Sequence, residues 1–465
     1  MRPTDTGGDA ARENCGLALG TVTRSVYRQA MPDSTTAVRT RARAMLALVV
    51  AGEMIFSLPF HLPRYFRPSV LATFGLSNAQ LGDVFALYGV TAMLAYFPGG
   101  ALADRFPARG LMCASLLATA AGGLYLLTLP GTLGLTLLYG YWGVTTILLF
   151  WAALIRATRN WGGQLAQGRA FGILDGGRGL VAATVATVAV ACFSLLAGHD
   201  VQVLGATERR AALRAVILLY TGATVIAAAL VWRWVPADMD RESTRRRFDV
   251  GELVAVLRLR VVWLQAVIVV CAYCGYKGLD NYGLYAHQVL GFSEISAAGI
   301  SASGAYIRPL AAVLAGLSAD RLGVARSIVG LFGLLILVYS ALGLLAATAA
   351  TQIIIYGNLA LSFAAVFALR GVYFALLEAT AVPARLTGAA VGLVSLVGYT
   401  PDIFFAAVAG RLLDAAPGAA GHQHYFILLA VLAIIGLAAA ALLVPARATA
   451  ASQSRPYPMS IKERP

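Results

Sequence analysis

The chain has 465 residues, of which 59% are hydrophobic and 12% are charged, and its mean hydropathy is +0.74. Soluble domains carry about 25% charged residues, so this composition excludes a soluble globular protein and predicts a polytopic membrane protein. The formal net charge is +14, from 34 arginines and two lysines against 22 acidic residues. Because the arginines lie in short loops and tails, the positive-inside rule accounts for the excess, and we expect no nucleic-acid partner.

Twelve apolar segments reach the length of about 20 residues that a membrane-spanning helix needs. Backbone groups in lipid must bond within the segment or within a closed barrel, and continuous apolar runs without a two-residue period indicate helices. The predicted fold class is therefore an all-α membrane protein. The first six predicted spans are 44–65, 79–99, 111–130, 132–155, 169–196 and 211–233, and the second six are 261–287, 295–316, 325–346, 352–377, 386–410 and 424–445.

These spans divide the chain into two six-helix bundles. The predicted segments are an N-terminal tail, 1–43, the first bundle, 44–233, a basic linker, 234–260, the second bundle, 261–445, and a C-terminal tail, 446–465. Arginines precede the first span and recur in alternate loops, so we expect both termini in the cytoplasm of a cell whose inner membrane holds the protein. The first span is expected to act as an uncleaved signal anchor. The linker is interpreted as a cytoplasmic segment lying on anionic headgroups, with a regulatory or partner site as the alternative.

One charged sequence motif occurs in both bundles. The loop after the second span reads Gly-Ala-Leu-Ala-Asp-Arg over 100–105, and the loop after the eighth reads Gly-Leu-Ser-Ala-Asp-Arg over 316–321. Their aspartates, Asp104 and Asp320, are 216 residues apart (320 minus 104), and the same shift places Gly75 on Gly291. Ser77 falls on Ser293 as well. This spacing predicts two parallel repeats with a binding site between them near the bilayer midplane.

The repeated loop resembles the signature loop of the major facilitator superfamily of secondary transporters. Both copies depart from the usual Gly-Arg-Lys ending, because the first ends in Pro-Ala-Arg at 107–109 and the second in Gly-Val-Ala-Arg at 323–326. The resemblance implies twelve helices that rock around one central site. Residues at the cytoplasmic helix ends are the candidates for gating, either by pairing with the loop aspartates and helix termini or by snorkelling to headgroups. They are Gly100, Asp104, Arg105, Arg109, Arg156, Gly316, Asp320, Arg321, Arg326, Arg370 and Glu378.

Acidic side chains inside the spans are candidates for proton coupling, because an ionisable group at that depth costs at least about 2.5–3.5 kcal/mol. Glu53 lies near the middle of the first span among apolar neighbours, which favour the protonated acid. A structural hydrogen bond is the alternative. Asp175 lies one turn before Arg178 in the fifth span, and we expect the two to share a helical face. Asp280 lies in the seventh span and is the third candidate.

Cationic and aromatic side chains inside the spans are the candidates for binding substrate. In this superfamily the fifth and eighth spans meet at the central cavity, so Arg178 and Arg308 are expected to converge there and to bind a carboxylate or phosphate. The segment Tyr276-Lys277-Gly278-Leu279-Asp280 is similar to one in organophosphate–phosphate antiporters. The resemblance adds Tyr276 and Lys277, with His61 near the position of their first-span arginine. Tyr306, beside Arg308, completes the set.

The predicted function is secondary active transport of a small organic anion or acidic polar metabolite by alternating access, coupled to protons. The alternatives are anion exchange without a net proton, proton-driven drug efflux and a transporter-like ligand sensor. No nucleophile–base pair, phosphate-binding loop or metal-ligand set is present in the sequence, so we predict no enzyme, no cofactor and no metal. The expected partners are the substrate, protons and the lipid bilayer, and the expected state is a monomer.

Overall fold

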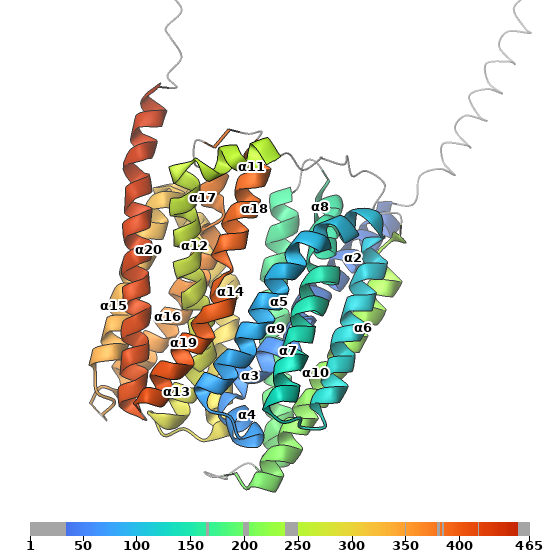
Figure 1. Cartoon of the computed structure of the whole chain (residues 1–465), viewed down its shortest axis with the longest axis vertical. Coiled ribbons are helices and arrows are strands. Elements are labelled where there is room, and N and C mark those ends of the chain that lie inside the picture. The colour runs from blue at the N-terminus through green and yellow to red at the C-terminus, as the bar shows by residue number, and fades with distance from the viewer. Residues whose placement is uncertain are drawn as a thin grey trace, which may run out of the picture.

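The protein is a bundle of long helices (Figure 1). The computed structural model describes residues 34–163, 167–198, 204–237, 250–348, 350–378, 382–383, 386–416 and 418–453, and among them there is no strand. The predicted all-α fold class is confirmed. Most of the predicted N-terminal tail, the linker residues 238–249 and the chain from 454 onward lie outside the described residues.

The first bundle contains all six predicted spans, two of them with interruptions. Its helices are α2 (Ser34–Met54), η1 (Ser57–His61), α3 (Leu62–Tyr65), α4 (Arg67–Phe74), α5 (Asn78–Arg105), α6 (Ala108–Leu126), α7 (Thr132–Val144), η2 (Thr145–Trp151), α8 (Ala152–Gly162), α9 (Gln167–Ala197) and α10 (Ala206–Trp234). The first predicted span corresponds to α2, η1 and α3 together, and the fourth corresponds to α7, η2 and α8.

The second bundle repeats this plan after one short helix in the linker. Its helices are α11 (Val250–Leu257), α12 (Arg260–Gly278), η4 (Leu279–Asn281), α13 (Tyr282–Gln288), α14 (Glu294–Leu322), α15 (Val324–Leu344), α16 (Gln352–Val372), α17 (Ala375–Glu378), α18 (Thr387–Gly398), α19 (Pro401–Ala415) and α20 (Ala419–Gln453). Ten helical segments of the described part are long and apolar enough to cross a bilayer, or up to twelve if two bent pairs each count as one span.

The internal repeat is visible in how the second helix of each bundle begins. Gly75 and Gly291 both have a positive φ, 62° and 73°. Ser77 and Ser293 follow two residues later as N-caps, and each side chain accepts a hydrogen bond from a backbone N–H in the first turn of α5 or α14. A left-handed backbone conformation favours glycine, and the side chain of a serine N-cap accepts a hydrogen bond from an otherwise unpaired backbone N–H. The sequence shift of 216 therefore marks the same local structure twice.

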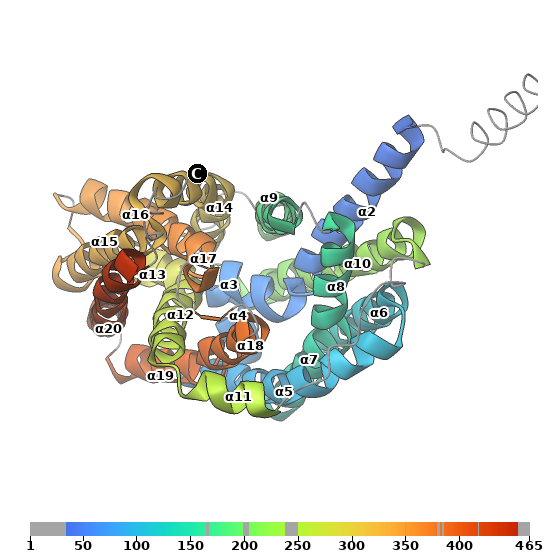
Figure 2. The same cartoon turned by 90° about the horizontal axis from the view of Figure 1, so that it is seen from above.

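The two bundles lie side by side, and the view from above separates them (Figure 2). We call the end that holds Asp104 and Asp320 the signature end, and the end that holds α4 and α13 the opposite end. Polar contacts between the bundles gather at mid-depth and at the opposite end. There Arg411 pairs with Asp83 at 2.8 Å, and Arg209 pairs with Glu294 at 2.7 Å.

Glycines bring α5 and α19 into backbone contact along the opposite end. A Cβ atom on Gly82 would lie 2.4 Å from the Ala406 carbonyl oxygen, and one on Gly89 would lie 2.5 Å from the Asp402 backbone. Gly410 of α19 lies equally close to Asn78 of α5. Small residues allow helix backbones to approach closely in membranes, so these three positions let α5 and α19 pack backbone against backbone from the opposite end to the depth of Asp402.

Candidate substrate pocket

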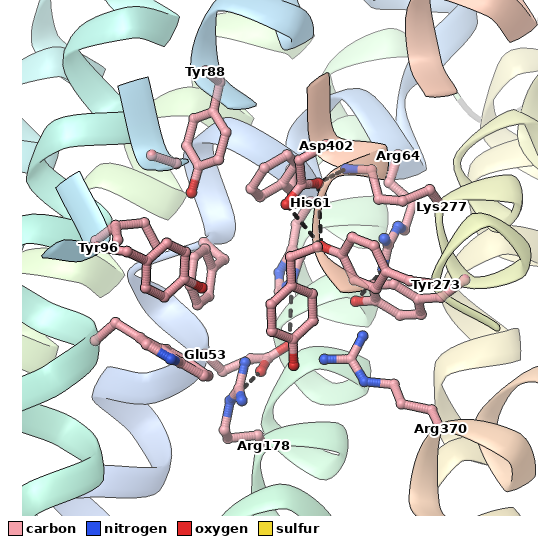
Figure 3. A pocket seen from close by; sticks show the side chains of 17 residues that line it. Glu53, His61, Arg64, Tyr88, Tyr96, Arg178, Tyr273, Lys277, Arg370 and Asp402 are labelled. Carbon is pink, nitrogen blue, oxygen red and sulfur yellow. Dashed lines mark hydrogen bonds and ion pairs between the residues drawn. The ribbon is translucent and has the colours of Figure 1, made fainter. Parts of the chain in front are cut away.

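A pocket lies between the two bundles at mid-depth (Figure 3). Its empty volume is about 730 Å³, including the part that is open to solvent. Both bundles supply its walls, as expected for a site between two repeats. The lining residues are Glu53, Phe56, Phe60, His61, Arg64, Tyr88, Ala92, Tyr96, Ile147, Trp151, Arg178, Tyr273, Tyr276, Lys277, Arg370, Tyr399 and Asp402.

Interruptions in the spans turn the lining residues inward. Pro59 has no backbone N–H, and the surrounding π-turn η1 lets the His61 N–H bond instead to the Phe56 carbonyl at 3.3 Å. The chain bends there by 41°. A second π-helix, η2, carries Ile147 and Trp151. Irregular helical turns of this kind recur at functional sites, and both π-helices here contribute to the wall of the first bundle.

Glu53 is the centre of one charge cluster. Its side chain is 3% exposed and lies 3.0 Å from Arg178 Nε, 3.1 Å from His61 Nε2 and 3.6 Å from Arg308 Nη1. The apolar neighbours of Glu53 in the first span are buried as predicted, but the bend in that span and two other helices also bring cations to it, which the sequence did not predict. A buried carboxylate is stable only with such partners.

Arg308 connects the two bundles. From α14 it reaches Glu53 of α2, and its Nη2 donates to Asp175 of α9 at 2.6 Å. Gly179 of α9 makes room for it, because a Cβ atom there would lie 3.1 Å from Arg308 Cδ. Gly52 makes room for Arg178 in the same way, at 3.2 Å. Asp175 and Arg178 do not pair with each other within α9, because Asp175 bonds to Arg308 of α14 and Arg178 bonds to Glu53 of α2.

A second charge cluster joins Arg64, Lys277, Asp280 and Asp402. Arg64 Nε donates to Asp280 Oδ1 at 2.5 Å, and Lys277 Nζ lies 3.6 Å from Asp280 and 3.3 Å from Asp402. The Tyr273 hydroxyl donates to Asp402 at 3.0 Å. Arg64 and Asp280 are themselves separated by 216 residues, so an ion pair forms between repeat-related positions.

Arg370 reaches into the pocket from the second bundle without a carboxylate partner. Its guanidinium lies 4.0 Å from the centre of the Tyr276 ring, a cation–π contact. No ion pair is found for it among the described side chains, and its buried Nη1 has no hydrogen-bond partner there. The sequence grouped Arg370 with gating residues at a helix end, whereas the structure places it in the pocket wall (Figure 3).

Aromatic rings form much of the wall contributed by the first bundle. Phe60 stacks on Phe85 with ring centres 5.8 Å apart, and Lys277 Nζ lies 4.1 Å from the centre of the Phe60 ring. Arg178 lies 5.8 Å from the centres of both the Phe56 and Trp151 rings. The pocket therefore presents an aromatic wall facing a wall of cations and hydroxyl groups.

The remaining predicted binding residues divide between the pocket and its surroundings. His61, Tyr276, Lys277 and Arg178 line the pocket, and Arg308 lies behind Glu53. Tyr306 does not line it: its side chain is 48% exposed and its hydroxyl lies 2.9 Å from that of Thr187. Tyr306 lies two positions before Arg308 and so points to another face of α14.

Sequence reasoning did not select Arg64, Tyr273 or Asp402 as binding residues. Arg64 is the second-last residue of the first predicted span, and it is buried. Asp402 follows the break between α18 and α19, which carries it into the pocket wall. The ion pair between Arg64 and Asp280 had a signal in the sequence, because the repeat shift of 216 residues aligns these two opposite charges.

The predicted gating residues lie at the signature end. Asp104, Arg105, Asp320, Arg321 and Arg326 are exposed, and neither aspartate has an ion pair among the described side chains. Arg156 donates to the Phe106 carbonyl at 2.7 Å, and Arg109 stacks over Trp232 at 4.5 Å. Added Cβ atoms on Gly100 and Gly316 would meet nothing. The side chain of Glu378 lies outside the described part, and the gating roles stay predictions.

The titratable side chains offer no metal site within the described part of the chain. No group of three or more His, Cys, Asp or Glu side chains comes together there in a way that could hold a metal ion. Cys271 and Cys274 are buried as free thiols. The charged clusters consist of carboxylates and cations in contact.

Comparison with known proteins supports the architecture. The family model described as Major Facilitator Superfamily matches residues 45–406. The inner membrane protein YihN of Escherichia coli K12 is 28% identical over 85% of this chain and 94% of its own length. YqcE, an inner membrane protein of the same organism, is 26% identical over 81% and 88%.

Solved structures agree on the fold. A bacterial homologue of the human lysosomal transporter Spinster, solved inward-facing and unoccupied, has a TM-score of 0.66 at 14% identity and covers 88% of this chain and 98% of its own. The nucleoside transporter NupG has a TM-score of 0.60 at 12% identity, with coverage of 87% and 98%. With the family model spanning most of the sequence, this chain belongs to the Major Facilitator Superfamily and is a membrane transport protein, not an enzyme.

Proposed function

We propose that this protein is a proton-coupled secondary transporter of a small organic anion or acidic polar metabolite. The observation that carries the proposal is Arg370, a pocket-lining guanidinium without a carboxylate partner among the described side chains. Arg64, Arg178 and Lys277 each already contact a carboxylate of the protein. A substrate that supplies the missing negative charge would satisfy Arg370, and guanidinium groups bind carboxylates and phosphates in two-point geometry.

The aromatic wall narrows the substrate further. Phe56, Phe60, Tyr96 and Trp151 line the same pocket as the cations. An anion with a ring or an apolar face opposite its acidic group would use both walls, because aromatic side chains contribute large apolar contact area. A drug-like cation would meet Arg370 with like charge, which argues against cation efflux.

We propose the membrane placement on separate grounds. Arginine placement favours both termini in the cytoplasm, and the relatives YihN and YqcE are named inner membrane proteins. The signature end would then face the cytoplasm, and the contacts at the opposite end would close the pocket from the outside. Alternating access requires those contacts to open and the signature end to close. One chain contains a complete pocket, which supports a monomeric carrier.

Transport by reconstituted vesicles tests the proposal. Uptake of labelled benzoate, gluconate, glucuronate and glycerol 3-phosphate is expected under an inward proton gradient, and tetraphenylphosphonium is expected to be excluded. Arg370→Gln should weaken anion uptake about ten- to a hundredfold, which corresponds to a lost charged hydrogen bond of about 1.5–3 kcal/mol. Arg370→Lys should retain part of it. Arg233→Gln, an exposed site on α10, is the matched control. Transport of the cation but of none of these anions would contradict the proposal.

Anion exchange without a net proton is the second candidate. The observation that favours it is Glu53, which two guanidinium groups that never lose their charge hold as a permanent counter-ion. Exchange would require an internal counter-anion and would ignore uncouplers, whereas proton-coupled uptake would collapse when the gradient is dissipated. A ligand sensor would bind the anion without moving it.

A further inference from the structure

The two carboxylates that line the pocket differ in how many cations hold them. Glu53 contacts two arginines and His61. Asp402 contacts one cation, Lys277 at 3.3 Å, and shares it with Asp280 at 3.6 Å. Asp280 has Arg64 as its own partner. Among the carboxylates that face the pocket, Asp402 is therefore the one with the least compensating charge.

We propose that Asp402 is the carboxyl group that carries the transported proton, and that the substrate anion replaces it beside Lys277. The inference rests on the proposed anion transport. A proton from the solvent binds a carboxylate oxygen of Asp402, and no covalent bond other than that O–H forms or breaks. Lys277 is then free to contact the anion together with Arg370. When the anion leaves, Lys277 returns to Asp402 and the proton is released to the same side.

The charge balance of the second cluster explains the coupling. With Asp402 ionised, Arg64 and Lys277 balance Asp280 and Asp402, so the four groups are neutral together. Protonation of Asp402 leaves one positive charge in excess, close to Arg370, and the pocket attracts an anion more strongly. By linkage, a bound anion must then favour protonation of Asp402 to the same extent.

The side chains around Asp402 make it the group of this cluster that gains and loses a proton. From α12 it faces Tyr273, Cys274 and Lys277, and from α5 it faces Tyr88 and Tyr96. The helix α20 also packs on α19, and its Tyr425 donates its hydrogen bond to the Gly278 carbonyl and not to Asp402. Tyrosine, thiol and lysine side chains keep their protons near neutral pH in their unperturbed state. His61 belongs to the Glu53 cluster, with its Nε2 3.1 Å from that carboxylate.

Glu53 is less suited to the task. Protonating it would leave Arg178 buried without a carboxylate partner among the described side chains, while Arg308 would keep Asp175, and an uncompensated buried charge is strongly unfavourable. Protonating Asp402 leaves only Lys277, which keeps Asp280 within 3.6 Å. Asp402 is also more accessible, with a side chain 17% exposed against 3% for Glu53.

Calorimetry on the purified full chain tests the inference. Benzoate, gluconate, glucuronate and glycerol 3-phosphate are titrated in buffers of different ionisation enthalpy, which reports the protons taken up per anion bound. The wild type should take up about one proton per anion, and its affinity should rise up to about tenfold per unit fall in pH. Asp402→Asn mimics the protonated state, so it should bind tightly at every pH without proton uptake. In vesicles it should keep anion counterflow and lose accumulation driven by a pH gradient.

Two further variants keep the outcomes separable. Asp402→Ser removes the carboxylate with a different side chain. It should show the same pH-independent binding, and it provides the test if the Asp402→Asn variant does not fold. Glu208→Gln, at the exposed start of α10, is the matched control and should keep the pH dependence. Proton uptake that persists in Asp402→Asn overturns the role of Asp402 while anion transport stands. Binding of none of the four anions by the wild type overturns the proposed function itself.

Discussion

At the scale of single residues, Glu53 holds together charges from three helices. Replacing it by glutamine leaves Arg178 buried without a carboxylate partner among the described side chains and leaves Arg308 with Asp175 alone. Removing one partner of a buried ion pair costs about 3–5 kcal/mol, so Glu53→Gln should lower the free energy of unfolding by an amount in that range. The measurement is denaturant unfolding of the protein in detergent.

A double substitution shows whether this cost comes from the unpaired cation. Adding Arg178→Met to Glu53→Gln should restore part of the lost stability, since the uncompensated charge is removed with it. Asp83→Asn provides the contrast, because its pair with Arg411 is about half exposed on both sides and should matter by less than about 1 kcal/mol. Strictly additive losses in the double variant would contradict the cluster.

Most of the buried charges could be found from the sequence, but their pairing could not. Glu53, Arg178, Lys277 and Arg308 stand out because a charge inside an apolar run is costly. Helical spacing predicted that Asp175 and Arg178 would share a face of one helix, but it did not show that each side chain bonds across to a different helix. Pairing across helices depends on their relative rotation, which is not visible in the spacing along one of them.

At the scale of helices, the contact between α5 and α19 depends on the absence of side chains. Gly89→Val would place a side chain where the Asp402 backbone lies. We expect the two helices to separate, so that the opposite end no longer closes and gradient-driven transport fails. Spin labels on exposed residues at the start of α5 and the end of α19, Gln80 and Ala415, should then report a longer distance.

A second glycine provides the control for this prediction. Gly222 of α10 has nothing within 4 Å of an added Cβ, so Gly222→Val should leave the label distance unchanged. An unchanged distance in Gly89→Val as well would mean that the contact is not what closes this end.

The helices themselves could be placed from hydropathy, and the breaks within them only in part. Each of the twelve predicted spans falls on a described helix or on a broken run of helices. The fifth span contains several glycines, and they differ in packing: Cβ atoms added at Gly177 and Gly179 would meet other helices, while those at Gly168, Gly172 and Gly176 would meet nothing within 4 Å. The π-turns arise from packing and from Pro59, and hydropathy carries no signal for them.

At the scale of the whole molecule, the two bundles are held together at the opposite end by polar groups. Arg209 of α10 contacts both carboxylate oxygens of Glu294 on α14, and the Ser69 hydroxyl donates to the same carboxylate. Arg209→Gln removes the charged partner from this network. We expect a shift of the population toward conformations open at this end, by about fivefold or more if the pair contributes about 1 kcal/mol.

The distance between labels on Gln80 and Ala415 is the measurement for this variant too. The population with a longer label-to-label distance should increase in Arg209→Gln. The charge-preserving Arg209→Lys should have much of the short-distance population of the wild type. A distribution that matches the wild type would show that this network does not control the closed state.

The sequence alone determined the class of the protein, its twelve spans and its duplication, because hydropathy, loop charge and a repeated motif are local properties of the chain. It also identified most of the buried charged residues, which are stable in the membrane interior only when they pair with opposite charges. The tertiary structure decided which of those charges meet, and it left Arg370 and Asp402 in the pocket as the cation without a carboxylate and the carboxylate with least compensation. Coulomb interactions act between atoms close in space, and the packing of bent helices sets those distances.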